Sequence, residues 1–100
     1  MTDEWSFLTK HGSVLLCIAQ DPGARLRDIA AAVGITERTA HGIVADLVDG
    51  GSVVKERQGR RNRYQIQPNQ PLHNPVGRKG TVGEVLGVLM DGTDKAPARR

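Results

Sequence analysis

Four arginines within seven residues are the side chains of this chain whose type and spacing point most clearly to chemistry. The segment reads Arg57-Gln58-Gly59-Arg60-Arg61-Asn62-Arg63. A glycine lies among the arginines and no acidic residue interrupts them. A cationic segment of this kind indicates either a polyanionic partner or a merely solvated charged loop.

The positive charge of the chain is concentrated around these arginines. The net charge is +3 over 100 residues. Residues 1–51 carry four basic and seven acidic side chains, a balance of −3, whereas residues 52–67 carry five basic and one acidic side chain, a balance of +4. Because charge that serves only solubility would be spread along the chain, this asymmetry favours a polyanionic partner.

Other classes of site find little support in the composition. The single cysteine, Cys17, lies in an apolar run and the histidines are scattered over different elements, so no metal site is predicted. No nucleophile, base and orienting group converge, so neither an enzyme nor a cofactor is expected. The acidic start and the lack of an apolar run of roughly 20 residues predict a cytoplasmic, nucleoid-associated chain with no membrane contact.

Two helices are expected in the first third of the chain. Thr9 can cap a helix over about residues 10–20, whose apolar residues cover more than one face, as in a central core helix. A short helix follows over residues 27–33, and Gly34 ends it in the manner of a glycine just past a helix terminus.

A third helix is expected from Glu37 to about Asp49, with Thr36 as its N-cap. Its apolar residues repeat at i, i+3, i+4, i+7 and i+8, which predicts one buried stripe. The stripe consists of Ala40, Ile43, Val44, Leu47 and Val48. The opposite face is short-chained at its centre, around Gly42 and Ala45, so another molecule could approach the backbone closely.

The rest of the chain predicts a hairpin, a connector and a last helix. Two short strands, 53–56 and 64–67, flank a longer glycine-containing turn. A proline-broken, extended connector follows over residues 68–80. Thr81 and Glu84 form a capping-box pattern, which predicts a helix over residues 81–90, and residues 91–100 are predicted to be a disordered tail.

The order helix, short helix, glycine-isoleucine turn, helix and basic hairpin resembles the winged helix-turn-helix of bacterial and archaeal transcriptional regulators. The run Leu26–Ala40, the exit Ile43–Gly51 and the hairpin carry the resemblance, which covers about residues 9–67. It is most similar to the small MarR-like and ArsR-like regulators. It implies a mainly α fold with a small β-hairpin (α+β): a three-helix core, a two-stranded wing and a C-terminal helix, with residues 1–67 as the DNA-binding domain.

The resemblance also implies sequence-specific binding of double-stranded DNA. The third helix would enter the major groove, about 12 Å wide, where an arginine bidentate to guanine is the commonest specific contact. Arg38 is the candidate for that contact, and the hairpin arginines would hold backbone phosphates or enter a minor groove. The residues predicted at the DNA are Thr36, Glu37, Arg38, Thr39, His41, Gly42, Arg57, Arg60, Arg61, Asn62 and Arg63.

The last helix is predicted to form a homodimer through an apolar stripe. The stripe consists of Val82, Val85, Leu86 and Leu89. A two-fold dimer would place two recognition helices roughly 34 Å apart, one DNA turn. The alternative is that this helix folds back on its own domain. The chain lacks the long flanking helices and paired cysteines of the resembled groups, so the sequence gives no sign of their effector or metal sites, and any small-molecule effector is unknown.

Three other functions compete with specific DNA binding. The first is a protein-interaction module, since winged helices also serve in that role. The second is nonspecific, chromatin-like DNA binding, which would show as no enriched motif when bound duplexes are selected from a random library. Binding of RNA or single strands would require aromatic stacking platforms. Tyr64 is the only aromatic residue near the hairpin, so this third function is disfavoured.

Overall fold

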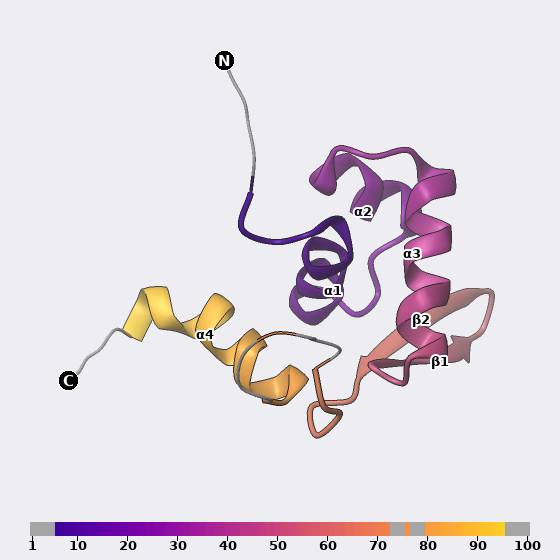
Figure 1. The fold of residues 1–100 in the computed structure, drawn as a ribbon. Coiled ribbons are helices and arrows are strands. Elements are labelled where there is room, and N and C mark those ends of the chain that lie inside the picture. The colour runs from indigo at the N-terminus through magenta and orange to yellow at the C-terminus, as the bar shows by residue number, and fades with distance from the viewer. Residues whose placement is uncertain (1–5, 73–75, 77–79, 96–100) are drawn as a thin grey trace, which may run out of the picture.

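The structure is a computed structural model that describes residues 6–72, 76 and 80–95. Within these residues the chain forms four helices and one antiparallel hairpin (Figure 1). In chain order the elements are α1 (Lys10–Gln20), α2 (Leu26–Val33), α3 (Glu37–Asp49), β1 (Val53–Gln58), β2 (Arg61–Ile66) and α4 (Val82–Lys95). The arrangement confirms the expected fold class, a mainly helical winged helix-turn-helix.

The helix boundaries follow from capping residues that the sequence already indicates. The Thr9 hydroxyl accepts a hydrogen bond from the backbone N–H of Gly12 at 3.1 Å, which begins α1. The Thr36 hydroxyl accepts from the N–H of Thr39 at 3.0 Å and begins α3. Gly34 ends α2 with a φ of 84°, in the left-handed region that glycine adopts without steric cost. Each of the two threonine N-caps stabilises its helix by about 1 kcal/mol.

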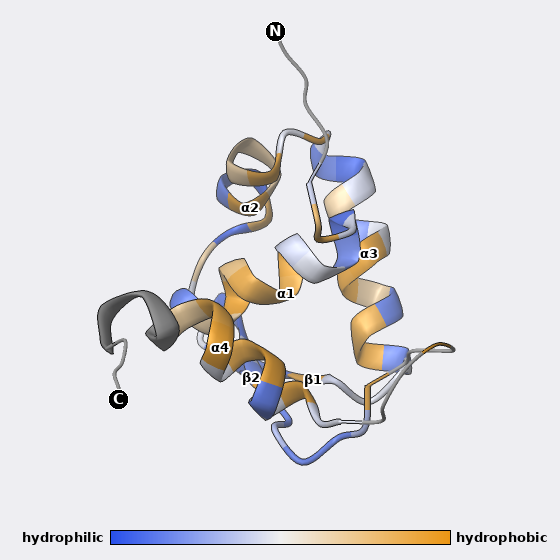
Figure 2. Ribbon diagram, turned by 60° about the vertical axis from the view of Figure 1, so that its left-hand side comes forward, coloured by the Kyte–Doolittle hydropathy of each residue, from blue (hydrophilic) through white to orange (hydrophobic). Residues whose placement is uncertain are grey.

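The core forms around α1, which contacts α2, α3, α4 and β2. Val14 and Ile18 of α1 are fully buried, and they pack in one cluster with Ile29 of α2 and Ile43 of α3. Each such side chain contributes about 1.5–3 kcal/mol through its removal from water. Figure 2 shows apolar residues along α1 and along the part of α4 beside it. The prediction of a central first helix is therefore confirmed.

The hairpin is longer and its turn tighter than the sequence suggests. The strands pair from Val53 opposite Ile66 to Gln58 opposite Arg61, which leaves Gly59 and Arg60 as the turn. Gly59 has a φ of 62°, as the first residue of a primed two-residue turn requires. The predicted longer turn is wrong because backbone pairing continues beyond the apolar base of the hairpin. The alternation of apolar and polar residues that reveals a strand is absent from this outer part, because its paired residues are all charged or polar.

The connector fastens the start of α4 to the rest of the fold. The backbone N–H of Val82 donates to the carbonyl of Gln70 at 2.9 Å, and the N–H of Gly83 donates to the carbonyl of Pro68 at 2.9 Å. The predicted capping box is present, since the N–H of Thr81 donates to the Glu84 carboxylate at 2.9 Å and the N–H of Glu84 donates to the Thr81 hydroxyl.

The last helix extends to Lys95, beyond the predicted end at Met90. Part of the segment expected to be a disordered tail is therefore helical, and residues 96–100 lie outside the described part of the chain. Figure 1 shows this helix beneath α1, with its C-terminal end directed away from α3 and the hairpin. Helix α4 lies against the body of the domain, because it contacts α1.

Candidate nucleic-acid interface

The outer face of α3 is exposed along its whole length. Arg38, His41, Gly42, Ala45 and Asp49 are all exposed, whereas the opposite side of the helix is anchored in the core by its buried apolar stripe. Apart from its chain neighbours and the backbone of its own helix, a Cβ atom at Gly42 would have no heavy atom of the protein within 4 Å. The centre of this face is therefore open space, and a second molecule can approach the helix backbone there.

The first turn of α3 has its polar groups already organised. The Thr36 hydroxyl accepts from the Thr39 N–H and donates to the Thr39 side-chain oxygen at 2.9 Å. The single hydrogen of the Thr36 hydroxyl is thus used inside the protein, while the Thr39 hydroxyl keeps its own hydrogen to donate. Glu37, also in this turn, interacts favourably with the helix dipole. Of these three residues, Thr39 is best disposed to contact a partner.

The register of the hairpin divides its polar side chains between two faces. Successive residues of a strand point to opposite sides, and directly paired residues share a side. Val53 and Tyr64 pack in the core, so the side chains in line with them face the helices. Lys55, Arg57 and Asn62 belong to that inner side, and Glu56, Arg61 and Arg63 to the other.

The four hairpin arginines are not equivalent in their contacts. The Arg61 guanidinium donates to the carbonyl of Gly23, in the turn between α1 and α2. Arg57 donates through Nε to the carbonyl of Gly59 at 3.3 Å, within the hairpin itself. Neither Arg60 nor Arg63 makes a hydrogen bond or an ion pair with the residues that the structure describes. One of the predicted contacts, Arg61, therefore serves to hold the hairpin against the helices.

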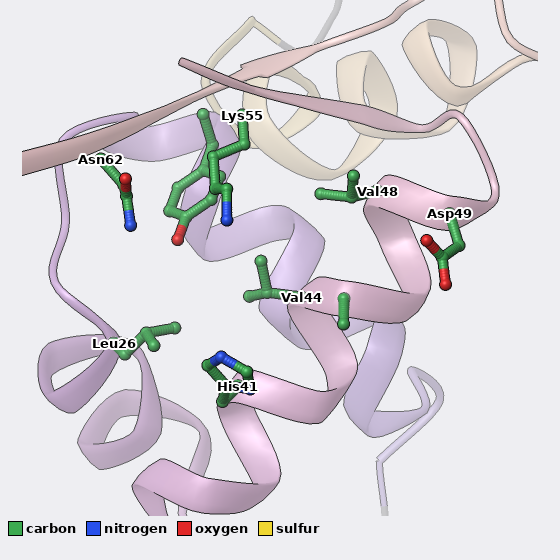
Figure 3. Close-up of a pocket in the computed structure, with 9 residues that line it drawn as sticks. Leu26, His41, Val44, Val48, Asp49, Lys55 and Asn62 are labelled. Atoms are coloured by element: carbon green, nitrogen blue, oxygen red, sulfur yellow. The ribbon is translucent and has the colours of Figure 1, made fainter. Parts of the chain in front are cut away.

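A cavity of about 260 Å³ separates α3 from the inner side of the hairpin (Figure 3). Lys55 and Asn62 extend into it from the hairpin and His41 from α3, while Leu26 of α2 lies at one side and Val48 at the other. The structure thus brings together predicted residues from α3 and from the hairpin. It adds Lys55, which sequence reasoning missed because the pairing of Lys55 with Tyr64 was not foreseen.

The acidic residues of α3 lie on two sides of the helix. The Asp46 carboxylate pairs with His11 of α1 at 2.7 Å, and both side chains are at least half exposed. Exposed pairs of this kind contribute only about 0–1 kcal/mol. Asp49 borders the cavity beneath the hairpin, at the C-terminal end of α3. Neither Asp46 nor Asp49 forms an ion pair with a cation of the hairpin in the described part of the chain.

The apolar residues of α4 that were predicted to form a dimer differ in their burial. Val82 and Leu86 are only 2% and 7% exposed, because they face the protein's own core. This burial agrees with the alternative that the helix folds back on its domain. Val85 stays 37% exposed, Leu89 is half-buried, and Val88, which was not predicted, is 71% exposed.

Other chemistry finds few candidate groups in the described residues. No helix among them combines the length and apolar character needed to cross a bilayer. No cluster of three or more His, Cys, Asp or Glu side chains in this part of the chain could hold a metal ion. Partial burial raises the pKa of the Cys17 thiol above its usual value, which makes the thiolate less accessible at neutral pH.

Comparison with known proteins agrees with this geometry. No curated protein sequence matches the chain. A family model described as the IclR helix-turn-helix domain matches residues 8–57, the range from α1 through most of β1. The match supports the class of helix-turn-helix regulators and does not confirm the MarR-like or ArsR-like groups. The chain thus contains a DNA-binding domain of transcription regulation, and it belongs to the family of IclR helix-turn-helix domains.

Proposed function

We propose that the protein binds duplex DNA sequence-specifically as a homodimeric transcriptional regulator, with α3 in the major groove. One observation carries the proposal: the open outer face of α3 and the cationic hairpin border the same cavity. A duplex seated against α3 would thereby also meet the hairpin. The small side chains at the centre of the face suit close approach to base edges.

The two elements would divide the work of binding. Arg38 is exposed near the start of α3, where an arginine can contact a guanine edge. Arg57 on the inner side of the hairpin and Arg60 at its turn would contact the DNA backbone or the rim of a minor groove. Arg63 is directed to the other side, opposite Glu56 in the register, which offsets part of its charge.

The homodimer rests on the apolar side chains that α4 leaves in solvent. Val85 and Val88 are exposed along one side of the helix, whereas Val82 and Leu86 are covered by the protomer itself. A second copy packed on this remaining strip would produce two recognition helices related by a two-fold axis. Sedimentation of the protein with and without Val88→Asp measures this part of the proposal directly, since a dimer formed elsewhere would be unaffected by the substitution.

Selection of bound duplexes from a random library tests the function as a whole. The expected result is an enriched motif with two-fold symmetry and half-sites about one helical turn apart. Binding without an enriched motif would instead indicate the nonspecific, chromatin-like role. Failure to retain any duplex at low salt would contradict DNA binding by this surface and favour the protein-interaction module.

A further inference from the structure

A groove made of two neighbouring cavities lies between the hairpin and the helix-turn-helix. It consists of the cavity of about 260 Å³ against α3 and a second cavity of about 310 Å³ at the starts of α2 and α3. Leu26, Asn62 and Tyr64 line both cavities, so the two cavities are neighbours at these residues. The groove therefore leads from the C-terminal half of α3, past Asn62, to the turn of the hairpin.

The polar groups at the centre of the groove are mainly cations and hydrogen-bond donors. The Lys55 amine and the Asn62 amide point from the hairpin toward α3, from which His41 points back (Figure 3). Lys55 makes no hydrogen bond or ion pair within the described residues. The second cavity is also lined by Arg25, Arg60 and Arg61. Since ammonium and guanidinium groups can only donate hydrogen bonds, this lining suits an anion.

Two carboxylates border the groove, one near each end. Asp49 lies beyond Val48 in Figure 3, and it forms no ion pair with Lys55 although both line the same cavity. Glu37 borders the second cavity from the first turn of α3, where its charge already interacts favourably with the helix dipole. Neither acid neutralises the amine at the centre, so the positive potential there stays available to a ligand.

We propose that this groove is a seat for consecutive backbone phosphates of duplex DNA, with Lys55 as a principal contact and Arg25 as a second contact outside the hairpin. The inference rests on the proposed function, since it requires α3 to lie in the major groove. The phosphate backbone of one DNA strand separates that major groove from the next minor groove. In a duplex seated on α3, this backbone would pass under the hairpin. An elongated cationic groove matches this strand, whose phosphates repeat about every 3.4 Å along the helix axis.

The first test measures the salt dependence of affinity for a short duplex carrying the selected site. Lys55→Met removes the charge and keeps most of the side chain's length. Each lost phosphate contact should lower the slope of log K against log salt by about 0.9 and weaken binding about three- to tenfold. Lys55→Arg should restore both values. Lys10→Met on α1 is the matched control, because it removes the same charge from a residue that lines neither cavity.

The same titrations distinguish failure of the inference from failure of the function. If the wild-type protein does not bind duplex at all, the proposed function is wrong. If it binds, and Lys55→Met equals either the wild type or Lys10→Met, the groove is not a phosphate seat. Thermal unfolding of each variant separates loss of contact from loss of fold. Asp49→Asn is a variant that should bind the duplex more tightly. Removal of this acid from the cavity should strengthen binding about twofold or more, and an unchanged affinity would contradict the proposal.

Discussion

The recognition helix α3 and the hairpin lie side by side but are held in opposite ways. Buried residues in the middle of α3 and partly buried ones near its C-terminal end anchor the helix, and its exposed face carries little net charge. The hairpin has its buried residues, Val53 and Tyr64, away from its turn. Its outer part is charged, exposed and fastened to the helices chiefly by the contact of Arg61 with Gly23.

This difference separates geometric precision from electrostatic attraction. A helix that is fixed in the core can present side chains to base edges within tight limits, which is what discrimination among sequences needs. Phosphate contacts tolerate a mobile, charged arm, because attraction between charges depends weakly on exact position. The comparison therefore predicts that substitutions in the hairpin change affinity for every duplex, whereas substitutions on α3 change which duplex is preferred.

The largest effect is expected from Arg57→Ala combined with Arg60→Ala. Loss of two phosphate contacts should lower the slope of log K against log salt by about 1.8 and weaken binding by about one to two orders of magnitude, equally for all sequences. Arg63→Ala is the control for position, since it removes one arginine from the other side of the hairpin and should have less than half the effect. Fluorescence anisotropy at several salt concentrations measures both. A single Arg63→Ala effect as large as that of the double variant would contradict the assignment of the faces.

A smaller and different effect is expected from Arg38→Ala. Loss of a bidentate guanine contact should remove about 1–3 kcal/mol of discrimination at one base pair of each half-site. The salt slope should change little, because the contact is to a base rather than to a phosphate. Repeating the duplex selection with the variant identifies the base pair concerned. An unchanged motif with a reduced salt slope would place Arg38 on the backbone instead.

Most of the fold could be predicted from local signals, and the exceptions share one physical cause. Thr9, Thr36 and Gly34 mark helix ends through bonds to residues a few positions away, so they are readable from the chain. The position of α4 depends on backbone hydrogen bonds from Val82 and Gly83 to the connector. Backbone groups are the same in every residue, so no side-chain pattern reveals where such bonds form.

The candidate site could be predicted only in part for the same reason. Charge density indicated the hairpin, and small side chains indicated the open face of α3. The roles of individual cations depended on the register of the strands, which places Lys55 on the inner side with Tyr64 and gives Arg61 a carbonyl partner in Gly23. Register follows from the turn, and the two-residue turn was missed among residues that are all polar.

The turn itself offers the next test of the comparison. Gly59 has a positive φ, and an alanine held there would cost about 1–2 kcal/mol. Because the outer hairpin is joined loosely to the core, Gly59→Ala should raise hydrogen exchange in the amides of β1 and β2 while those of α3 keep their protection. Equal loss of protection in both elements would show that the hairpin and α3 unfold as one unit.

The smallest expected effect, and the one that most directly separates stability from function, comes from Gly42→Ala on α3. Gly42 lies in a helix, and a Cβ atom there would touch no side chain and no backbone outside its own helix, so alanine should raise the free energy of unfolding by about 0.5–1 kcal/mol. If α3 lies in the major groove with its backbone close to the bases, the added methyl group should nevertheless weaken DNA binding. Urea unfolding and anisotropy on the same samples measure both quantities. A variant that gains stability and keeps full affinity would contradict close approach at the centre of α3 and shift the contact toward its first turn.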